Sequence, residues 1–217
     1  MKICFCPTTK VVQNRQGLLI LPGYVKLVKN LIPHFIQDQC LAGKAHGRMQ
    51  AYAMFVDMSG FTALTETLMA QGARGAEQLS KALNDIFSPL VRLVYSRGGF
   101  IPYFAGDAFT AVFPANSPRV TATGFIQTAI IARDMFAEKE LHLGAFSISI
   151  KIGLSFGNVE WGIVGNRRNA FYFRGAPVDH SAQGQSMAGK LEIVMDAALS
   201  RMLEGQGFAL TELSVGF

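Results

Sequence analysis

The sequence predicts an α+β fold in which an antiparallel-rich sheet carries helices packed on one face. Three observations lead to this fold class. Apolar runs of strand length alternate with longer segments of helical periodicity, in the order β-α-α-β-β-α-β-β. Two of the apolar runs flank a Gly-Asp pair, which predicts a hairpin. Half of the 217 residues are hydrophobic, so the chain can fill a substantial core.

The front of the chain is expected to form an arm followed by a helix. Residues 1–23 show no clear period, although the run at 17–21 is compatible with a short strand. Residues 24–39 carry apolar side chains at helical spacing, and Pro33 should kink or divide this helix. Residues 42–49 are expected to be a polar linker. The helix either packs on its own domain or contributes to a dimer contact, and the sequence leaves both open.

The main domain is expected to begin with an apolar strand at residues 51–57, which ends on Asp57. Periodicity then predicts a helix at 59–70 and a longer helix at 76–96, with Pro89 inside the second. We therefore divide the chain into an N-terminal arm and helix and one domain. These two parts comprise residues 1–49 and residues 50–217.

A hairpin with Asp107 at its tip is expected next, formed by apolar runs at residues 100–105 and 108–114. The segment 120–138 has the composition of a helix. The remaining elements are expected at residues 147–155 (strand), 158–164 (strand, paired with the previous one across Phe156-Gly157), 170–173 (strand), 179–189 (helix), 191–194 (strand) and 197–203 (helix).

Asp57 and Asp107 are the leading candidates for a chemical site. Taken alone, Asp57 at a strand-to-helix turn would be a simple helix N-cap. In the predicted sheet, however, the strand end and the hairpin tip lie side by side, so the two carboxylates should face each other. Two adjacent carboxylates repel unless a cation neutralises them, and hard oxygen ligands suit Mg²⁺. Two such ions can activate an attacking oxygen and stabilise a leaving pyrophosphate.

Two further features are suited to binding phosphate. The small-residue turn after Asp57 leads into a helix start, where backbone N–H groups are available to anionic oxygens. Lys151 alternates with Ile150 and Ile152 along a strand, so it should point away from the core. The alternative for Lys151 is an ordinary exposed strand lysine.

These residues carry a resemblance to a known family. The motifs are Phe-Val-Asp-Met-Ser-Gly-Phe-Thr at 55–62, Phe-Ala-Gly-Asp-Ala at 104–108 and Lys-Ile-Gly-Leu at 151–154. Their sequences and spacing resemble those of class III nucleotidyl cyclases over roughly residues 50–200. Gly-Ala-Glu-Gln-Leu at 75–79, and Pro-Val-Asp at 177–179 followed by Gln-Ser-Met-Ala at 185–188, are most similar to the first catalytic domain of soluble, tandem-domain adenylyl cyclases.

The resemblance implies a ferredoxin-like class III cyclase fold that converts ATP to cyclic AMP and pyrophosphate. It implies two Mg²⁺ (or Mn²⁺) ions per complete site, with Asp57 and Asp107 as catalytic residues. By the same resemblance, the metal ligands are Asp57, Met58 and Asp107, and the triphosphate-binding residues are Ser59, Gly60, Phe61, Thr62 and Lys151.

The sequence also departs from that family at five positions. Where complete sites carry a base-reading lysine and a base-reading Asp or Thr, this chain has Tyr103 and Tyr172. The transition-state Asn and Arg fall on Asp179 and Gln183. The lysine and arginine that bind bicarbonate in the soluble relatives match Tyr103 and Ala182, which argues against bicarbonate regulation.

These departures predict a domain that contributes only the metal-binding half of a cyclase site. Such a chain needs a second, complementary cyclase domain, most simply one downstream in the native polypeptide, and an isolated homodimer should be nearly inactive. The alternative is a catalytically silent pseudo-cyclase that binds nucleotide or a regulatory partner. The residues alone do not distinguish ATP from GTP.

Composition and charge exclude several other classes of protein. The net charge is +5, but basic residues do not form runs interleaved with aromatics, so nucleic acid is not an expected partner. No apolar run reaches the roughly 18 residues of a transmembrane segment, and no secretory signal is recognisable. The three cysteines lack zinc-ligand spacing and are expected to be reduced thiols. We therefore expect a cytoplasmic protein.

Overall fold

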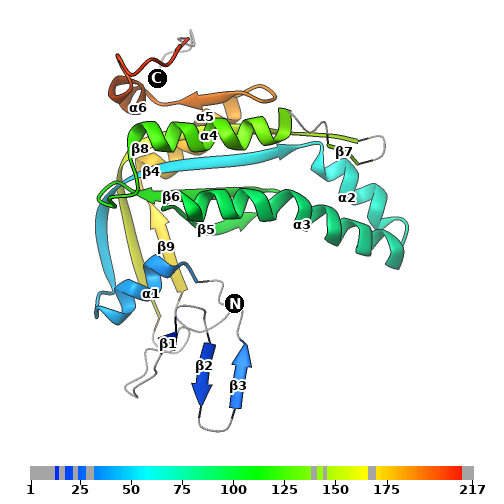
Figure 1. Ribbon diagram of the computed structural model, residues 1–217, viewed down its shortest axis with the longest axis horizontal. Coiled ribbons are helices and arrows are strands. Elements are labelled where there is room, and N and C mark those ends of the chain that lie inside the picture. Colours follow the sequence, from blue (N-terminus) through cyan, green and yellow to red (C-terminus); the bar gives the residue numbers. More distant parts are fainter. Residues whose placement is uncertain are drawn as a thin grey trace. The chain divides into compact units, whose positions relative to one another are not determined.

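The computed structural model describes residues 13–14, 18–21, 24–27, 32–137, 141–143, 146–165 and 170–211 (Figure 1). The chain divides into two compact units, one comprising residues 1–47 and 161–173 and the other residues 48–160 and 174–217. The second unit contains most of the sheet and all of the long helices. The proposed domain boundary between residues 49 and 50 remains a prediction.

The first unit contains a small antiparallel sheet and one short helix. Its strands are β1 (Gln13–Asn14), β2 (Leu18–Leu21) and β3 (Tyr24–Leu27), and its helix is α1 (His34–Leu41). The short strand expected at 17–21 is confirmed by β2.

The helix expected over residues 24–39 is wrong in its first half, where β3 lies instead. Helix α1 begins directly after Pro33, which has the extended backbone of an N-cap residue. Proline has no N–H to donate inside a helix but fits at a helix start. The helix therefore begins after Pro33 and does not run through it. Phe35 of α1 packs with its ring centroid 5.4 Å from that of Trp161, edge to face.

The main sheet has the strand order β10-β8-β4-β6-β5, and β7 and β9 also pair with β8. Its strands are β4 (His46–Ser59), β5 (Phe100–Ala105), β6 (Ala108–Pro114), β7 (Leu141–Leu143), β8 (Phe146–Val164), β9 (Ala170–Arg174) and β10 (Ile193–Met195). The pairs β4–β6, β5–β6 and β7–β8 are antiparallel, and β10–β8 is parallel. The antiparallel-rich α+β fold is confirmed, as is the hairpin with Asp107 at its turn.

Two features of the sheet differ from the sequence prediction. Strand β4 begins at His46, so residues 42–49 are not simply a linker. Strand β8 runs without a turn through Phe156-Gly157, where we expected two strands joined by a turn. Gly157 serves a close approach instead, because a Cβ there would lie 3.2 Å from Cγ of Pro177. Strand β7 was not predicted.

The helices of the second unit lie close to their predicted positions. They are α2 (Phe61–Met69), α3 (Ala73–Ser96), α4 (Ala122–Ala137), α5 (Ala176–Met187) and α6 (Ala197–Met202). Helix α2 starts two residues later than expected because Ser59 still belongs to β4. Helix α5 starts three residues earlier, since Pro177 fits the first turn of a helix. Pro89 lies inside α3 as expected.

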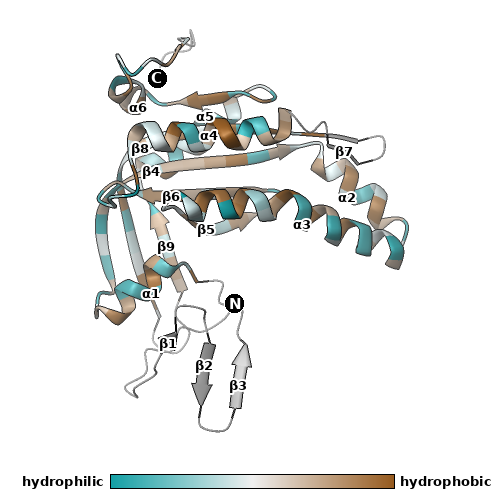
Figure 2. Cartoon of the chain, in the orientation of Figure 1, coloured by the Kyte–Doolittle hydropathy of each residue, from teal (hydrophilic) through white to brown (hydrophobic). Residues whose placement is uncertain are grey.

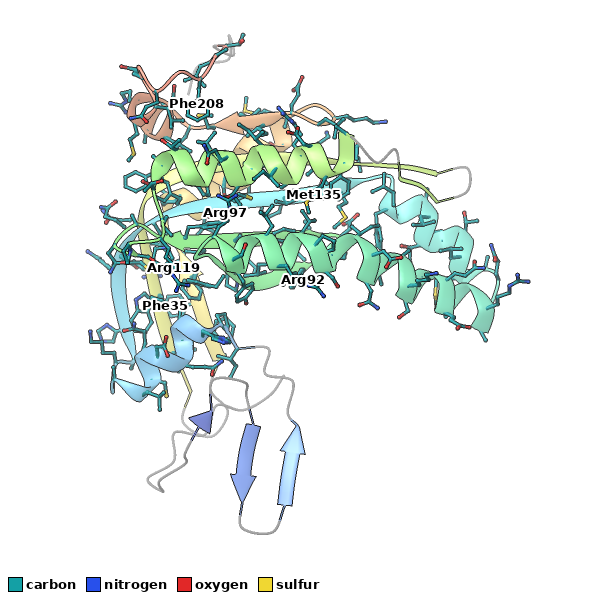
Figure 3. All side chains as sticks on the ribbon, in the orientation of Figure 1. Phe35, Arg92, Arg97, Arg119, Met135 and Phe208 are labelled. Atoms are coloured by element: carbon teal, nitrogen blue, oxygen red, sulfur yellow. The ribbon has the colours of Figure 1, made fainter. Side chains whose placement is uncertain are left out.

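The core lies between the sheet and helices α3 and α4, which cross in front of β4 and β6 in Figure 1. Every second residue of the strands faces these helices, as a pleated sheet requires. The buried set includes Met54, Val56, Met58, Ile86, Leu90, Phe109, Phe125, Ile126, Ile150, Ile152 and Leu154. Met135 of α4 and Phe208, which follows α6, pack against this core (Figure 3).

Figure 2 shows the same division by hydropathy, with apolar segments along the central strands and mixed colours along α3. Because α3 and α4 cover one face of the sheet, the alternate strand residues that point away from these helices are free to form a site on the other face.

Within the part of the chain that the structure describes, no helix is both long and apolar enough to span a membrane.

Candidate active site built on two carboxylates

The register between β4 and β6 places the two aspartates side by side. The antiparallel ladder pairs Val56 with Phe109, so Asp57 continues β4 just where Asp107 occupies the hairpin turn. Their charges interact, since the negative charge of Asp107 raises the pKa of Asp57. The structure therefore brings the two predicted carboxylates together.

The surroundings of Asp57 disfavour an uncompensated negative charge. Partial burial is the largest cause that raises the pKa of its carboxyl group above the ordinary value, and the charge of Asp107 is the second. Lys151 and a hydrogen bond from the backbone N–H of Met58 act in the opposite direction, but the pKa stays raised. A site with this balance favours a bound cation.

Lys151 lies on the same sheet face as Asp57, as the alternation predicted. Its neighbours Ile150 and Ile152 are completely buried on the core side, whereas Lys151 is half-buried. Its charge acts on Asp57, so its ammonium group and the carboxylate pair share one surface. Lys151 is thus the basic group next to the candidate metal ligands.

The turn after β4 exposes the start of α2. Gly60 adopts a left-handed backbone with φ of 91°, a conformation that glycine tolerates best, and it provides no side-chain cap. The first backbone N–H groups of α2, beginning at Phe61 and Thr62, have no acceptor within the helix. Ser59 and Thr62 are at least partly exposed, while the Phe61 side chain is buried. Phe61 can therefore contribute to anion binding only through its backbone.

A chain of phenylalanine rings connects this turn to the hairpin. Ring centroids are 6.4 Å apart for Phe61 and Phe87, 5.7 Å for Phe87 and Phe104, and 5.7 Å for Phe104 and Phe109. Phe61 follows the Asp57 turn, whereas Phe104 and Phe109 flank the turn that carries Asp107. Helix α3, through Phe87, thus fixes both aspartate-bearing turns against one another.

Helix α5 supplies a site residue that the sequence analysis missed. The side-chain Nε2 of Gln185 donates a hydrogen bond to Oδ2 of Asp57 at 2.9 Å. The helix can come this close because a Cβ on Gly153 would lie 1.8 Å from the carbonyl oxygen of Ser181. Gly153 of β8 and Gly184 of α5 were signals of such an approach, although no sequence pattern assigned them a partner.

Four of the five positions that depart from the family pattern lie in the second compact unit. The Tyr103 hydroxyl is hydrogen-bonded to Thr110, and the charge of Asp179 acts on it. Burial, the largest cause, raises the pKa of Tyr103. Ala182 is partly buried and Gln183 is exposed on α5.

Tyr172 belongs to the other compact unit, where it lies beside Gly162. Within the second unit, the charge of Asp179 acts on Tyr103. Among the described residues, neither position supplies a positive charge next to the two aspartates.

The donor set suits divalent cations that keep part of their water shell. Two carboxylates and the backbone of Met58 are hard oxygen ligands, as Mg²⁺ and Mn²⁺ prefer. In the described ranges, no group of three or more His, Cys, Asp or Glu side chains could hold an ion by itself. A metal held here would take its remaining ligands from water or from a bound phosphate.

The family model described as "Adenylate and Guanylate cyclase catalytic domain" matches residues 45–215, which is most of the chain. The chain belongs to the adenylate and guanylate cyclase catalytic domain family. This cyclase domain is 37% identical to adenylate cyclase type 10 of Rattus norvegicus over 148 residues and 34% identical to that of Homo sapiens over 147. These alignments cover 65% of the chain but only 9% of each relative.

Solved structures of cyclase domains share the fold of this chain. The adenylyl cyclase CyaB from P. aeruginosa is similar with a TM-score of 0.62 at 22% identity, covering 73% of this chain and 82% of that one. The guanylate cyclase domain of RhGC from Catenaria anguillulae, solved in complex with GTP, has a TM-score of 0.61 at 20% identity, covering 73% and 85%. The class III cyclase fold expected from the motifs is confirmed.

Proposed function

We propose that this cyclase domain supplies the metal-binding half of an adenylate cyclase site and completes it with a second, complementary cyclase domain. The reaction converts ATP to cyclic AMP and pyrophosphate. The observation that carries the proposal is the pairing of Asp57 with Asp107 beside Lys151 and the open start of α2.

Each residue has a role in this reaction. Asp57 and Asp107, with the backbone of Met58, would hold two Mg²⁺ or Mn²⁺ ions. Bound there, the ions would lower the pKa of the ribose 3′-hydroxyl and stabilise charge on the phosphates.

The start of α2, from Ser59 to Thr62, would bind triphosphate oxygens through backbone N–H groups. Lys151 would offset negative charge on the pyrophosphate as it leaves. The 3′-oxygen forms its bond to the α-phosphorus as the bond from that phosphorus to the bridging oxygen breaks.

The missing half of the machinery argues for a partner domain. None of Tyr103, Asp179, Ala182 and Gln183 is a lysine or arginine. The reaction needs side chains that hydrogen-bond the nucleotide base and that offset negative charge in the transition state. Losing one such donor typically lowers a rate by about 10²–10³. A homodimer would lack them in both of its sites, so it would be nearly inactive. The curated relatives are about ten times longer than the aligned segment, and a complementary domain elsewhere in one polypeptide is the simplest arrangement.

ATP is proposed as the substrate on the likeness to the adenylate cyclases of type 10. The base-reading positions do not contribute to this choice, because they are Tyr103 and Tyr172. Bicarbonate is not proposed as a regulator, since Tyr103 and Ala182 offer it no positive charge. The proposed compartment is the cytoplasm, where ATP is available.

A silent pseudo-cyclase is the second candidate function. The loss of the base and transition-state residues favours it, whereas the intact carboxylate pair opposes it. Under this alternative, the domain would bind nucleotide with metal but would never turn it over.

A reconstitution assay separates the two functions. The purified chain is mixed with a complementary cyclase domain that lacks its own metal-binding aspartates, and cyclic AMP is measured with ATP and Mn²⁺. Turnover that is abolished by Asp57→Ala and by Asp107→Ala would support the cyclase. Metal-dependent ATP binding without turnover, with several complementary domains, would support the pseudo-cyclase instead.

A further inference from the structure

Helix α5 carries a residue that reaches into the metal half-site and to which the sequence assigned no role, namely Gln185. The amide nitrogen Nε2 of Gln185 lies 2.9 Å from Oδ2 of Asp57, a normal distance for a hydrogen bond. The two residues are 128 positions apart, so only the folded sheet brings them together.

We propose that Gln185 is a positioning residue, which orients the Asp57 carboxylate for metal binding by holding Oδ2. This inference rests on the proposed metal-binding role of Asp57. A carboxylate has about four lone-pair sites, and one neutral donor leaves the other oxygen and its full charge available. Carboxylates that bind metals are commonly held by such outer hydrogen bonds.

The backbone that delivers Gln185 is held close to the sheet. A Cβ on Gly153 of β8 would lie 2.3 Å from the backbone nitrogen of Gln185 itself and 1.8 Å from the carbonyl oxygen of Ser181. Gly184 makes the matching approach from the helix, with its added Cβ 3.5 Å from Cα of Gly153. Contacts this close leave α5 little freedom to shift against β8.

The buried polar group of α5 that faces the sheet has its hydrogen-bond partner within the helix. Ser181 is completely buried, and its hydroxyl donates to the carbonyl of Val178 at 2.8 Å. The buried hydroxyl is thus satisfied within the helix itself. The amide of Gln185 is free to serve Asp57 from a fixed backbone.

The backbone N–H of Met58 holds the same carboxylate from a second direction. With Met58 on β4 and Gln185 on α5, two different elements restrain one side chain. Two restraints from separate elements define both the position and the rotation of a carboxylate, whereas one would leave it free to turn. If Gln185 instead blocked a metal-binding oxygen of Asp57, removing its amide would raise the affinity for metal.

The test uses the full chain and measures Mn²⁺ affinity by titration calorimetry. Gln185→Met keeps the length of the side chain but removes its donor. We expect the Mn²⁺ affinity to fall by about tenfold, while circular dichroism in EDTA shows that the variant still folds. The matched control is Gln127→Met, an exposed residue of α4, which should leave the affinity as in the parent chain.

A second variant keeps the proposal open to refutation if Gln185→Met folds poorly. Gln185→Leu also lacks a donor and adds no charge or metal ligand, so we again expect weaker Mn²⁺ binding. Tighter binding by either variant would overturn the proposal, because it would mean that Gln185 blocks the site or occupies a ligand position. Unchanged affinity in both variants would also overturn it.

A third measurement separates this inference from the proposed function. If Asp57→Ala binds Mn²⁺ as tightly as the parent chain, the metal role of Asp57 is wrong and the proposed function fails. If Asp57→Ala abolishes binding while the Gln185 variants bind normally, only the positioning role fails. In the reconstituted cyclase, we expect Gln185→Met to raise the Mn²⁺ concentration for half-maximal rate about tenfold, with the rate recovering at saturating metal.

Discussion

Val56 pairs with Phe109 across the antiparallel ladder of β4 and β6, and this register sets Asp57 next to Asp107. A shift of one residue would turn Asp57 into the core and remove it from the hairpin tip. The chemistry proposed for this domain therefore depends on strand register, which the core residues Val56 and Phe109 enforce from the opposite face.

The first prediction concerns the electrostatic cost of this pairing. The folded pKa of Asp57 is raised above its ordinary 3.8, mainly by burial and then by Asp107. Below pH 3.8 the carboxyl is protonated in both folded and unfolded chains. As the pH rises from 3.8 through the raised pKa, the folded state loses stability, and the penalty persists at pH 7.

We therefore expect Asp57→Asn to melt about 1–3 °C higher than the parent chain at pH 7 in EDTA. The advantage should disappear below pH 3.8, and excess Mn²⁺ should reverse the order by stabilising only the parent chain. Differential scanning fluorimetry over a pH series measures both effects. A destabilised Asp57→Asn protein at pH 7 without metal would contradict the raised pKa.

The second prediction concerns the contact between α5 and β8. Gly153→Ala would place a Cβ 1.8 Å from a backbone oxygen of α5, so the helix must move away. We expect a loss of about 1–3 kcal/mol in the free energy of unfolding, as for overpacked sites. Urea denaturation measures it.

The control for this prediction is Gly184→Ala on the facing helix. Its Cβ would lie 3.3 Å from the carbonyl oxygen of Val194, and the gain in helix propensity offsets the crowding. Equal losses for the two variants would mean that the close approach at Gly153 is not what limits the contact.

The third prediction concerns the phenylalanine rings that link the two aspartate turns. Phe87→Ala removes the ring between Phe61 and Phe104. Since Phe87 is only partly buried, we expect a loss of about 2 kcal/mol in unfolding free energy, below the range for a fully buried phenylalanine. Mn²⁺ affinity should fall as well, because both turns lose their common support.

The comparison for this variant is Phe125→Ala, in which the lost ring packs against Tyr52 and Phe113 away from the aspartates. It should destabilise the domain more, since Phe125 is almost completely buried. For each kcal/mol of unfolding free energy lost, however, Phe125→Ala should lower the Mn²⁺ affinity less than Phe87→Ala does. The same affinity loss in both variants would show that the link through Phe87 has no special role.

The fourth prediction concerns Tyr103, which stands where related sites carry a base-reading lysine. Its hydroxyl is bonded to Thr110, whose side chain is 1% exposed. Tyr103→Phe should cost about 1–3 kcal/mol by leaving the threonine hydroxyl buried without that partner. Adding Thr110→Val should recover most of the loss, because both polar groups are then gone. A double-mutant cycle in urea tests this, and simple additivity of the two losses would contradict the bond.

Much of this domain could be predicted from its sequence. The hairpin at residues 100–114 was predicted to the residue, because a Gly-Asp turn between two aromatic apolar runs has few other solutions. The pairing of Asp57 with Asp107 followed from the same reasoning. The turn proposed at Phe156-Gly157 failed because glycine marks close approaches as well as turns. The partner of that approach, Pro177, lies on a helix that local sequence does not place.

The amino-acid pattern alone thus determined most elements of the cyclase domain, the buried face of its strands and the pair of candidate carboxylates, since these depend on period and on neighbours in sequence. Only the tertiary structure decided that Gln185 meets Asp57, that Tyr103 meets Thr110 and that α5 lies directly on Gly153. These contacts join residues on separate elements, and their geometry is set by how closely two backbones pack rather than by any local preference.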